Sequence, residues 1–405
     1  MLLIKFVAIN KQSKMYKKLK FLSFLIFASL LIVACEKDDV TPTCSDGIMN
    51  GTETGVDCGG SCEPCAEPSE LQGDILEDRT LDASIQYSLT GALVIKAPAT
   101  LTIPAGTVIR ASGGTSAYIG VEQGAKINVN GTAASPVVMT SGASNPQQGD
   151  WGGLVIAGSA PTNKGATPTT EVGDLSYGGT TADDNSGSIR YLRVEYTGAT
   201  FTNEKEFNGV SLFGVGSGTT FEYVQAYEAG DDGIEFFGGT VNGNNLVVTN
   251  SYDDGIDFAD GWNGNGTNWY ISGAAKGAIE GSNNGDNGNA TPVTTTTLTN
   301  ITVVGPVSEG ALYYKEGGGS FTVDNMFVSG ANLGVKWKSS DTPAVTRVGN
   351  GDLSVDVKFA NNATGFIYNT GGDDTTVPSW MTIDDTNTGA GNGAAKPDWM
   401  NGWTK

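Results

Sequence analysis

Six short segments of the chain repeat one pattern, a tight turn of glycine or alanine followed by a strand whose side chains alternate in, out and in: 208–213, 232–237, 254–258, 277–281, 310–314 and 333–337. Their outward residues, spaced by 24, 22, 23, 33 and 23 positions, are Ser211, Glu235, Asp257, Glu280, Tyr313 and Lys336. The one long step contains the polar stretch 282–289, and without it the period is close to 23. A repeat of this length predicts a solenoid, in which each turn must stack on its neighbours to bury its apolar face.

The sequence from about residue 71 to 375 consists of short runs of β-favouring residues, separated by Gly, Asn, Asp and Thr. No stretch after residue 35 shows a convincing apolar period of 3.6, so we expect no helix there. Two or three strands in each coil, stacked in parallel about 4.8 Å apart, make a β-helix. The sequence therefore predicts an all-β chain whose main domain is a parallel β-helix filled with aligned Val, Ile, Leu and Phe.

Both ends of such a stack expose sheet edges that need a cover. Residues 376–405 carry Trp380, Trp399 and Trp403 among Asp, Asn and Gly. We expect an irregular C-terminal cap whose aromatic rings plug the last coil. The alternative is that these rings form an aromatic platform for sugars.

Residues 1–34 have the layout of a targeting segment. A basic stretch at 15–20 precedes an apolar run of 13 residues at 21–33, which is too short to span a bilayer. Residues 32–35 resemble the bacterial lipobox, in which the cysteine, here Cys35, becomes the lipidated first residue, and Met15 is the expected start. A cleaved ordinary signal peptide and an N-terminal helix are the alternatives. The acidic stretch 36–39 resembles an export signal, so we expect a lipid anchor in the outer membrane and a protein facing the cell exterior.

The composition restricts the partners of the chain. The six lysines of the targeting segment leave 17 basic against 44 acidic residues, a net charge of −27. Such a surface repels nucleic acid and anionic lipid and favours cations, cationic partners or neutral sugars. We therefore expect no nucleic-acid partner and no membrane contact besides the lipid anchor.

A small cysteine-rich module is expected at residues 35–70. Apart from Cys35, its cysteines are Cys44, Cys58, Cys62 and Cys65. Two disulfides in an oxidising compartment explain four clustered cysteines in so short a module, although four cysteines allow three pairings. Zinc is the alternative, because the last two cysteines have ligand spacing, but the chain contains no histidine.

The same module contains a partial calcium-loop pattern. Asp46, Asn50, Gly51 and Asp57 fall at positions 1, 5, 6 and 12 of an EF-hand-like loop, whereas position 3 is Ile48. Calcium at Asp46, Asn50 and Asp57 is one reading. The other is that these are turn residues that shape a disulfide knot.

Carboxylates dominate one face of the predicted solenoid. If the isoleucines and phenylalanines of the repeat point inward, Glu235, Asp257 and Glu280 point outward on three consecutive coils, and Asp232 and Asp254 lie at the preceding corners. Adjacent unit charges about 4.8 Å apart repel by roughly 3.5 kcal/mol at an effective dielectric of 20. A bound Ca²⁺, a raised pKa or a nearby lysine such as Lys276 would relieve this repulsion. The alternative is that Asp-Asp-Gly is turn chemistry and the outward acids are solvated.

The same face continues with Tyr313, Lys315 and Lys336. Aromatic and basic groups beside acids suit a polysaccharide groove, so these three are the candidate ligand-binding residues. Histidine is absent, which excludes Ser-His-Asp, Cys-His and imidazole–metal sites.

Residues 75–405 resemble the right-handed parallel β-helix, or pectate-lyase-like, superfamily, and in detail bacterial surface lipoproteins with runs like 100–106, 149–154 and 231–239. The resemblance implies the fold but not the function, because this fold hosts lyases, hydrolases, esterases, adhesins and inert spacers. The superfamily's polygalacturonases pair their aspartates with Gly-His-Gly and Arg-Ile-Lys segments, and both are absent here.

These observations favour a monomeric surface lipoprotein that binds an extracellular polysaccharide or surface protein without catalysis. The alternative is a calcium-dependent polysaccharide lyase or glycoside hydrolase that uses the 231–336 face. Its catalytic carboxylates would come from Glu235, Asp257 and Glu280. In a lyase, Lys276, Lys315 or Arg193 would remove the proton. No cofactor other than Ca²⁺ is expected.

Overall fold

The computed structural model describes residues 43–54, 56–65, 69–202, 205–331, 333–361, 365–369, 372–374 and 376–405. The predicted targeting segment, with Met15 and Cys35, and the acidic stretch 36–39 lie outside the described residues. The chain divides into two compact units, with the boundary between Ala66 and Glu67. In the described part of the chain, no helix combines the length and the hydrophobicity that crossing a membrane requires.

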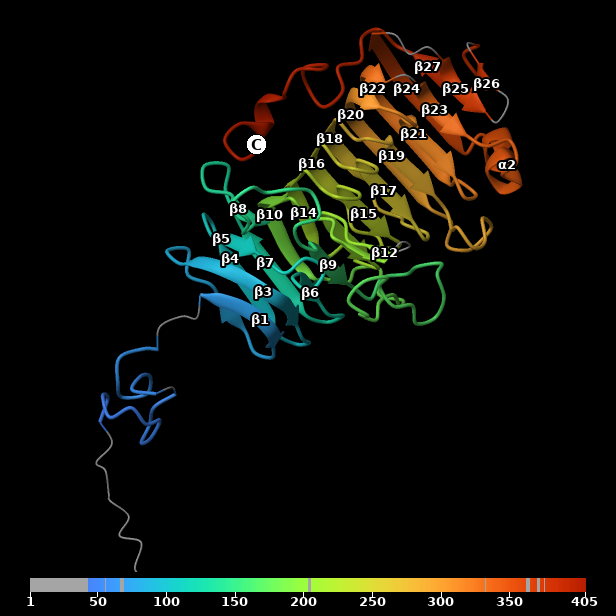
Figure 1. Ribbon diagram of the computed structural model, residues 1–405. Helices are drawn as coiled ribbons and strands as arrows, with labels where there is room; N and C mark the ends of the chain where they lie inside the picture. The colour runs from blue at the N-terminus through green and yellow to red at the C-terminus, as the bar shows by residue number, and fades with distance from the viewer. Residues whose placement is uncertain are drawn as a thin grey trace, which may run out of the picture. The chain divides into compact units, whose positions relative to one another are not determined.

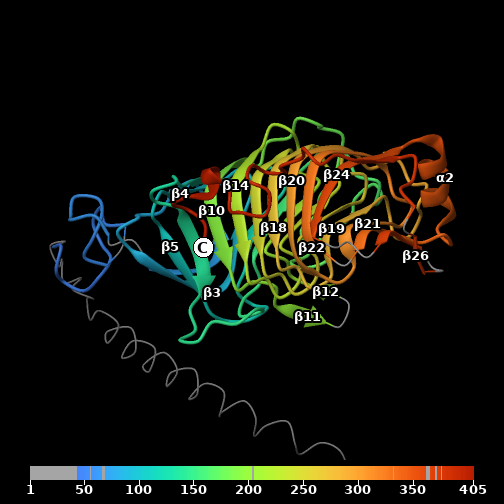
Figure 2. The ribbon, with the colours of Figure 1, turned by 90° about the horizontal axis from the view of Figure 1, so that it is seen from above.

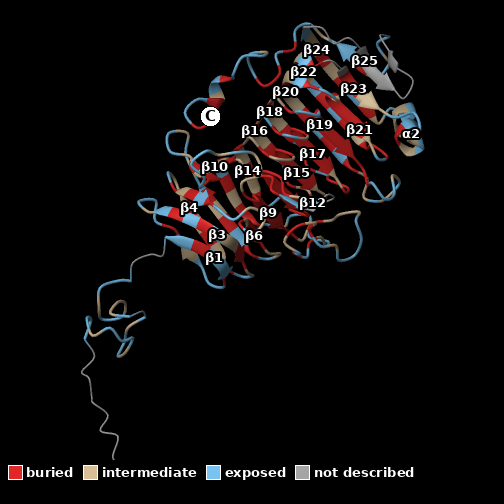
Figure 3. Cartoon of the chain, in the orientation of Figure 1, coloured by how far each residue is buried: buried red, intermediate tan, exposed pale blue. Residues whose placement is uncertain are grey.

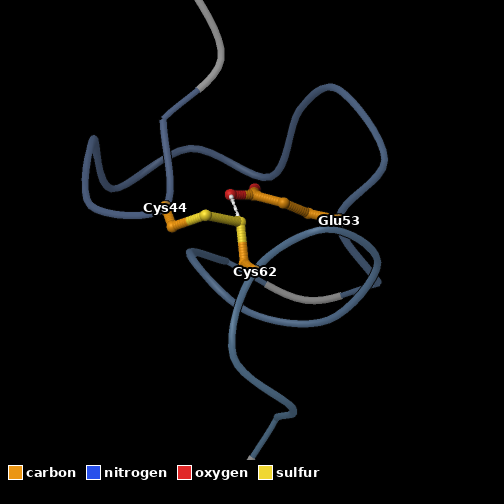
Figure 4. Close-up of side chains that lie close together, drawn as sticks. All are labelled: Cys44, Glu53 and Cys62. Atoms are coloured by element: carbon orange, nitrogen blue, oxygen red, sulfur yellow. Dashed lines mark hydrogen bonds between the residues drawn. A yellow bond between two sulfur atoms is a disulfide. The ribbon is translucent and has the colours of Figure 1, made fainter.

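The first unit is held by two disulfides, Cys44–Cys62 and Cys58–Cys65, so the prediction of two bridges is confirmed and their pairing is now defined. The Sγ atom of Cys62 lies 3.5 Å from Glu53 Oε1 (Figure 4). Because a disulfide sulfur carries no proton, this contact is not a thiol hydrogen bond. The bridges also leave no thiolate here for zinc, which excludes the zinc alternative in this structure.

The predicted calcium-loop residues act as turn-forming acceptors in this unit. Asp46 accepts from the backbone N–H of Ile48 at 3.0 Å and from Asn50 Nδ2 at 3.1 Å. Both oxygens of Asp57 accept from the N–H of Gly47 at 2.9 Å. Calcium binding by this loop stays a prediction.

The second unit is a parallel β-helix (Figures 1 and 2), which confirms the predicted fold class. Its first ladder begins with β2 (Arg79–Thr80), β4 (Thr100–Pro104) and β7 (Lys126–Asn130). Its second ladder contains β5 (Val108–Ala111) and β8 (Val137–Ser141). Two strands join the second ladder to the third in the opening coils, β1 (Glu70–Ile75) and β3 (Gln86–Ile95).

Long strands then span the first and second ladders together: β10 (Gly187–Glu195), β14 (Thr220–Tyr227), β16 (Gly243–Thr249), β18 (Gly266–Ser272), β20 (Thr295–Val307), β22 (Ser320–Ala331) and β24 (Leu353–Asn361), with β27 (Met381–Ile383) beside the last. The third ladder is made of short strands: β6 (Ile119–Val121), β9 (Leu154–Ala157), β13 (Val210–Phe213), β15 (Ile234–Phe237), β17 (Ile256–Ala259), β19 (Gly277–Ser282), β21 (Gly310–Lys315), β23 (Leu333–Trp337) and β25 (Gly365–Asn369). Two small antiparallel pairings complete the strands, β11 (Thr200–Thr202) with β12 (Lys205–Glu206) and β26 (Gly372–Asp374) with β25.

Each of the long strands from β10 to β22 bends at one residue of left-handed conformation, with φ between 51° and 61°: Tyr191, Tyr223, Asn245, Asn268, Asn300 and Asn325. Asparagine tolerates this conformation better than most residues. The amides also form a ladder, because Asn300 Nδ2 donates to Asn268 Oδ1 at 3.0 Å and Asn325 Nδ2 donates to Asn300 Oδ1 at 2.7 Å. This corner turns the sheet around a closed core.

The third ladder carries the repeat that the sequence predicted. Ile234 pairs in register with Ile256, which pairs with Ile279, and all three side chains are buried in the core. Figure 3 shows that β15, β17, β19 and β21 are buried along most of their length. Aromatic rings of Phe236, Trp262 and other residues fill the space between coils. The predicted alternation of inward and outward residues is therefore confirmed.

The outer face of this ladder is not simply open to solvent, however. A second apolar cluster covers its early coils, and it combines outward residues of β9 and β13 with residues of the loops at 159–185 and 196–209: Val155, Ala157, Val172, Leu175, Tyr177, Ala199, Phe207 and Phe213. An outward residue of the repeat can consequently be buried.

One helix, α2 (Thr342–Asn350), contradicts the expectation of no helix after residue 35. Its ends carry strong local signals. Asp341 accepts from the N–H of Ala344, Pro343 lies in the first turn, and Gly351 ends the helix in the left-handed conformation. Nine residues with Ala344 as the one buried side chain are too few for a clear apolar period.

The prediction that the C-terminal residues plug the last coil is wrong for most of this segment. After β27 the chain turns back along the outer face of the second ladder and ends beside its early coils (Figure 1). Along the way it contacts the outward residues of successive strands: Asp385 with Lys358, Ala390 with Thr302, Ala394 with Tyr270, and Lys405 with Gln225. We call residues 384–405 the C-terminal strap.

The predicted tryptophans of this region therefore have different places. Trp380 packs, partly buried, against the main core. Trp403 is fully buried instead against Tyr191 and Tyr223, with ring centroids 5.8 and 6.0 Å away. Trp399 stacks on Trp403. The last two rings fasten the C-terminal strap and do not plug the last coil.

Candidate functional site

A pocket of about 740 Å³ lies over the outer face of the third ladder. We call it the acidic pocket, because its lining consists of eleven acids, four lysines and one tyrosine: Glu171, Glu206, Asp231, Asp232, Glu235, Asp253, Asp254, Asp257, Glu280, Glu309, Glu316, Lys276, Lys315, Lys336, Lys338 and Tyr313. It therefore brings together the acids, the lysines and the tyrosine that the sequence predicted for the 231–336 face, whereas Ser211 and the candidate base Arg193 are not part of its lining.

The floor of the pocket is one column of residues in register. Glu235 on β15 pairs with Asp257 on β17, which pairs with Glu280 on β19, and this residue pairs with Tyr313 on β21. Lys336 on β23 continues the column. Neighbouring strands place these side chains about 4.8 Å apart, as the repeat predicted.

The carboxylates of this column are not solvated, which contradicts the simple turn interpretation. Only 9% of Glu235, 8% of Asp257 and 6% of Glu280 is exposed, and the corner residues Asp232 and Asp254 are also buried. The loops over the early coils and the neighbouring corners surround them. Charges this deeply buried need a partner, a proton or a bound ion.

The pKa values follow from this burial. Desolvation, followed by the charges of neighbouring carboxylates, raises the pKa of Asp232, Glu235, Asp254 and Asp257 well above the usual range. Desolvation also raises the pKa of Asp231 to about 8, and among the neighbouring charges Glu206 contributes most to this increase. The pocket therefore favours protons or cations over a full set of bare carboxylates.

The lysines neutralise only part of this charge. Lys315 forms an ion pair with Glu280, and Lys276 pairs with Asp253 at 2.5 Å. Lys276 therefore neutralises a corner aspartate and not an acid of the column.

The candidate bases are poorly suited to their role. Although burial lowers the pKa of Lys276, its hydrogen bond to Asp253 and the surrounding charges raise this pKa overall. A lysine that stays protonated is poorly suited to remove a proton. Arg193, another of the three candidate bases, lies on β10 and donates to Glu195 and to the carbonyl of Trp403.

The far end of the pocket combines Tyr313 with lysines. Lys336 Nζ lies 4.2 Å from the centroid of the Tyr313 ring, and those of Lys315 and Lys338 lie 5.5 and 6.0 Å away. Lys336 also pairs with Glu309 at 2.9 Å. This end thus adds lysines and one aromatic ring to a pocket that is otherwise acidic, with Lys315 and Lys336 paired to Glu280 and Glu309.

Several lining residues were missed by the sequence analysis: Glu171, Glu206, Glu309, Glu316 and Lys338. Glu171 belongs to the loop at 159–185 and Glu206 to the short strand β12, and their distance from the repeat in the sequence hides their contribution. Glu309 and Glu316 flank β21 directly, so the repeat itself could have identified them.

Two groups of three carboxylates are close enough to share an ion. One oxygen each of Asp232, Glu235 and Asp257 lies within 4.8 Å of the other two, and the same holds for Asp231, Asp232 and Asp253. Asp254, a predicted metal ligand, instead accepts from the N–H of Gly277.

The chain belongs to the pectate-lyase like beta helix domain family, whose pattern matches residues 73–404. No curated protein and no solved structure is significantly similar to it.

Proposed function

We propose that the protein binds an extracellular polysaccharide in the acidic pocket without cleaving it. The observation that carries this proposal is the lining of the pocket, in which 16 residues all bear a polar group. Sugar hydroxyls donate to carboxylates and accept from ammonium groups, and the Tyr313 ring adds a surface for stacking. A pocket so lined has little affinity for an apolar ligand.

The charge of the pocket narrows the class of glycan. Eleven acids against four lysines repel acidic polymers unless a cation lies between them. Neutral or amino-bearing polysaccharides are therefore the favoured ligands, and a basic surface protein is the other partner that this charge accepts. The same excess argues against nucleic acid.

The location proposed for this activity is the outer face of the outer membrane, where a lipid on Cys35 anchors a monomer. The basic and apolar stretches that precede this cysteine support it. Two disulfides in the neighbouring module are in keeping with an oxidising compartment.

One observation favours a second function, cleavage of the glycan. Burial raises the pKa of Glu171 to about 7, against the opposing charge of Lys205. A carboxyl group that is half protonated at neutral pH, beside other carboxylates, has the property of a general acid in a glycoside hydrolase. A lyase is less favoured, because Lys276 is held as an ammonium by Asp253.

A polysaccharide panel separates the two functions. The purified protein is passed through gels that contain neutral, amino-bearing or acidic polysaccharides, and the same samples are assayed for new reducing or unsaturated ends. We expect retention on at least one polymer and no new ends. Glu171→Gln should weaken retention roughly tenfold, the effect of one charged hydrogen bond, while exposed Asp324→Asn on β22 should change nothing.

Two results would overturn the proposal. Absence of retention on every polymer would exclude binding of these glycans. New reducing ends without unsaturation that disappear in Glu171→Gln would show that the protein is a hydrolase, and unsaturated ends would show a lyase.

A further inference from the structure

We propose that a hard divalent cation, for which Ca²⁺ is the probe, binds between Asp232, Glu235 and Asp257 on the floor of the acidic pocket. One carboxylate oxygen of each lies within 4.8 Å of the others. Calcium binds oxygens at about 2.3–2.6 Å, so two of its ligands can be up to about 5 Å apart. The three carboxylates can thus reach one ion without a rearrangement of the β-helix.

The second observation is a buried oxygen without a partner. Asp257 Oδ1 is inaccessible and accepts no hydrogen bond, although only 8% of the residue is exposed and it lines the pocket. A buried carboxylate oxygen is strongly unfavourable unless a donor or a cation meets it. Its neighbours in register, Glu235 and Glu280, offer acceptors when ionised. The missing partner is therefore a proton or a cation, and the three converging oxygens favour a cation.

Glu235 is already oriented for this role. Asn208 Nδ2 donates to Glu235 Oε2 at 2.5 Å, and its own Oδ1 is buried and also without a partner. Such a hydrogen bond fixes the carboxylate from behind, as the outer contacts of metal ligands do in known sites. Asp232 is held similarly, because its Oδ1 accepts from the N–H of Asp254 at 2.8 Å.

The positive charges of the pocket do not replace the cation at this place. Lys276 pairs with Asp253, and Lys315 pairs with Glu280 and Glu316. Among the ion pairs of the described residues, none includes Asp232, Glu235 or Asp257. The related group of Asp231, Asp232 and Asp253 differs in this respect, because Lys276 already supplies a charge to it.

This choice of ligands differs from the predicted pair Asp232 and Asp254. Asp232 is a ligand in both sets, but Glu235 and Asp257 take the place of Asp254 in the set proposed from the structure. All the ligands are carboxylate oxygens, which suit Ca²⁺ and Mg²⁺ better than softer metals. The cation site does not depend on the proposed function, since ion binding is measured without any glycan.

Calorimetric titration of Ca²⁺ into the metal-free mature chain tests the proposal. The titration is made in an Asp46→Asn background, so that the loop of the cysteine module does not contribute. We expect one ion per chain and a melting temperature that rises with Ca²⁺, because a ligand stabilises the state that binds it. Asp257→Asn and Asp232→Asn should each weaken binding by more than tenfold, with circular dichroism confirming that they fold.

Two controls make the assignment specific. Asp324→Asn removes an exposed acid on β22 and should leave the ion and its affinity unchanged. Asp253→Asn removes an acid of the neighbouring group and should keep the single ion, with a smaller loss of affinity than Asp257→Asn. Absence of heat and of a thermal shift at millimolar Ca²⁺ would overturn the proposal. So would unchanged affinity in Asp257→Asn, or loss of the ion in Asp253→Asn.

Discussion

Two neighbouring residues of β17 should respond in opposite ways to substitution. Ile256 is fully buried between Ile234 and Ile279 in the stacked coils. An aspartate at this position must take up a proton to stay in the core, which costs about 4 kcal/mol at pH 7 from its ordinary pKa. Loss of the aliphatic side chain adds about 2–5 kcal/mol. Ile256→Asp should therefore lose roughly 6–9 kcal/mol, as much as the whole stability of many domains.

Asp257→Asn should instead stabilise the metal-free protein. Glu235 and Glu280 lie on the adjacent coils, about 4.8 Å away, and each repels an ionised Asp257 by roughly 3.5 kcal/mol at an effective dielectric of 20. Lys315 attracts Asp257 and opposes this repulsion. The net relief is therefore smaller than the sum of the two contributions, on the order of a few kcal/mol.

Thermal and urea denaturation in EDTA, followed by circular dichroism, measures both variants against the wild type. Exposed Asp324→Asn serves as the control and should leave the transition in place. Equal shifts for Ile256→Asp and Asp257→Asn would refute the assignment of inward and outward positions. A destabilised but folded Asp257→Asn would show that the column repulsion is already relieved in the metal-free chain.

Two further variants test pH dependence and anchoring. Burial, only partly opposed by Lys164, raises the pKa of Asp260 to about 6, so the folded state resists its ionisation. This penalty is absent below about pH 4, grows as the pH rises, and reaches roughly 3 kcal/mol above pH 6. Asp260→Asn should thus melt higher than the wild type at pH 7.5 and equally at pH 4; a lower melting temperature at pH 7.5 would contradict the argument. Cys35→Ala should move the protein from the detergent to the aqueous phase, and persistence in detergent would exclude the lipid anchor.

The repeat in the sequence predicted the third ladder because it is a local pattern with a fixed period. A strand alternates its side chains with a period of two, and stacking in register follows when each coil has the same length. Glu235, Asp257, Glu280, Tyr313 and Lys336 are consequently in the predicted order. The two disulfides were predictable for a similar reason, since four close cysteines leave few arrangements.

Features that depend on contacts between segments far apart in the chain could not be predicted from a local sequence pattern. The C-terminal strap follows the second ladder because Trp403 finds Tyr191 and Tyr223, residues about two hundred positions earlier in the chain. The burial of the acids depends on loops inserted between strands, whose sequence lacks the period of the repeat. Helix α2 was missed because it is recognised by its capping residues and not by an apolar face.

The acids of the pocket floor are not a requirement of the β-helix. The same outward column holds Val155 on β9 and Ser211 on β13, both almost fully buried, so an uncharged side chain fits this place in the fold. Buried carboxylates at the next three coils lower the stability of the empty protein relative to such residues. Local departures from the most stable choice concentrate at functional sites. The confinement of the charges to coils beneath the acidic pocket therefore supports the proposal that this pocket binds a ligand.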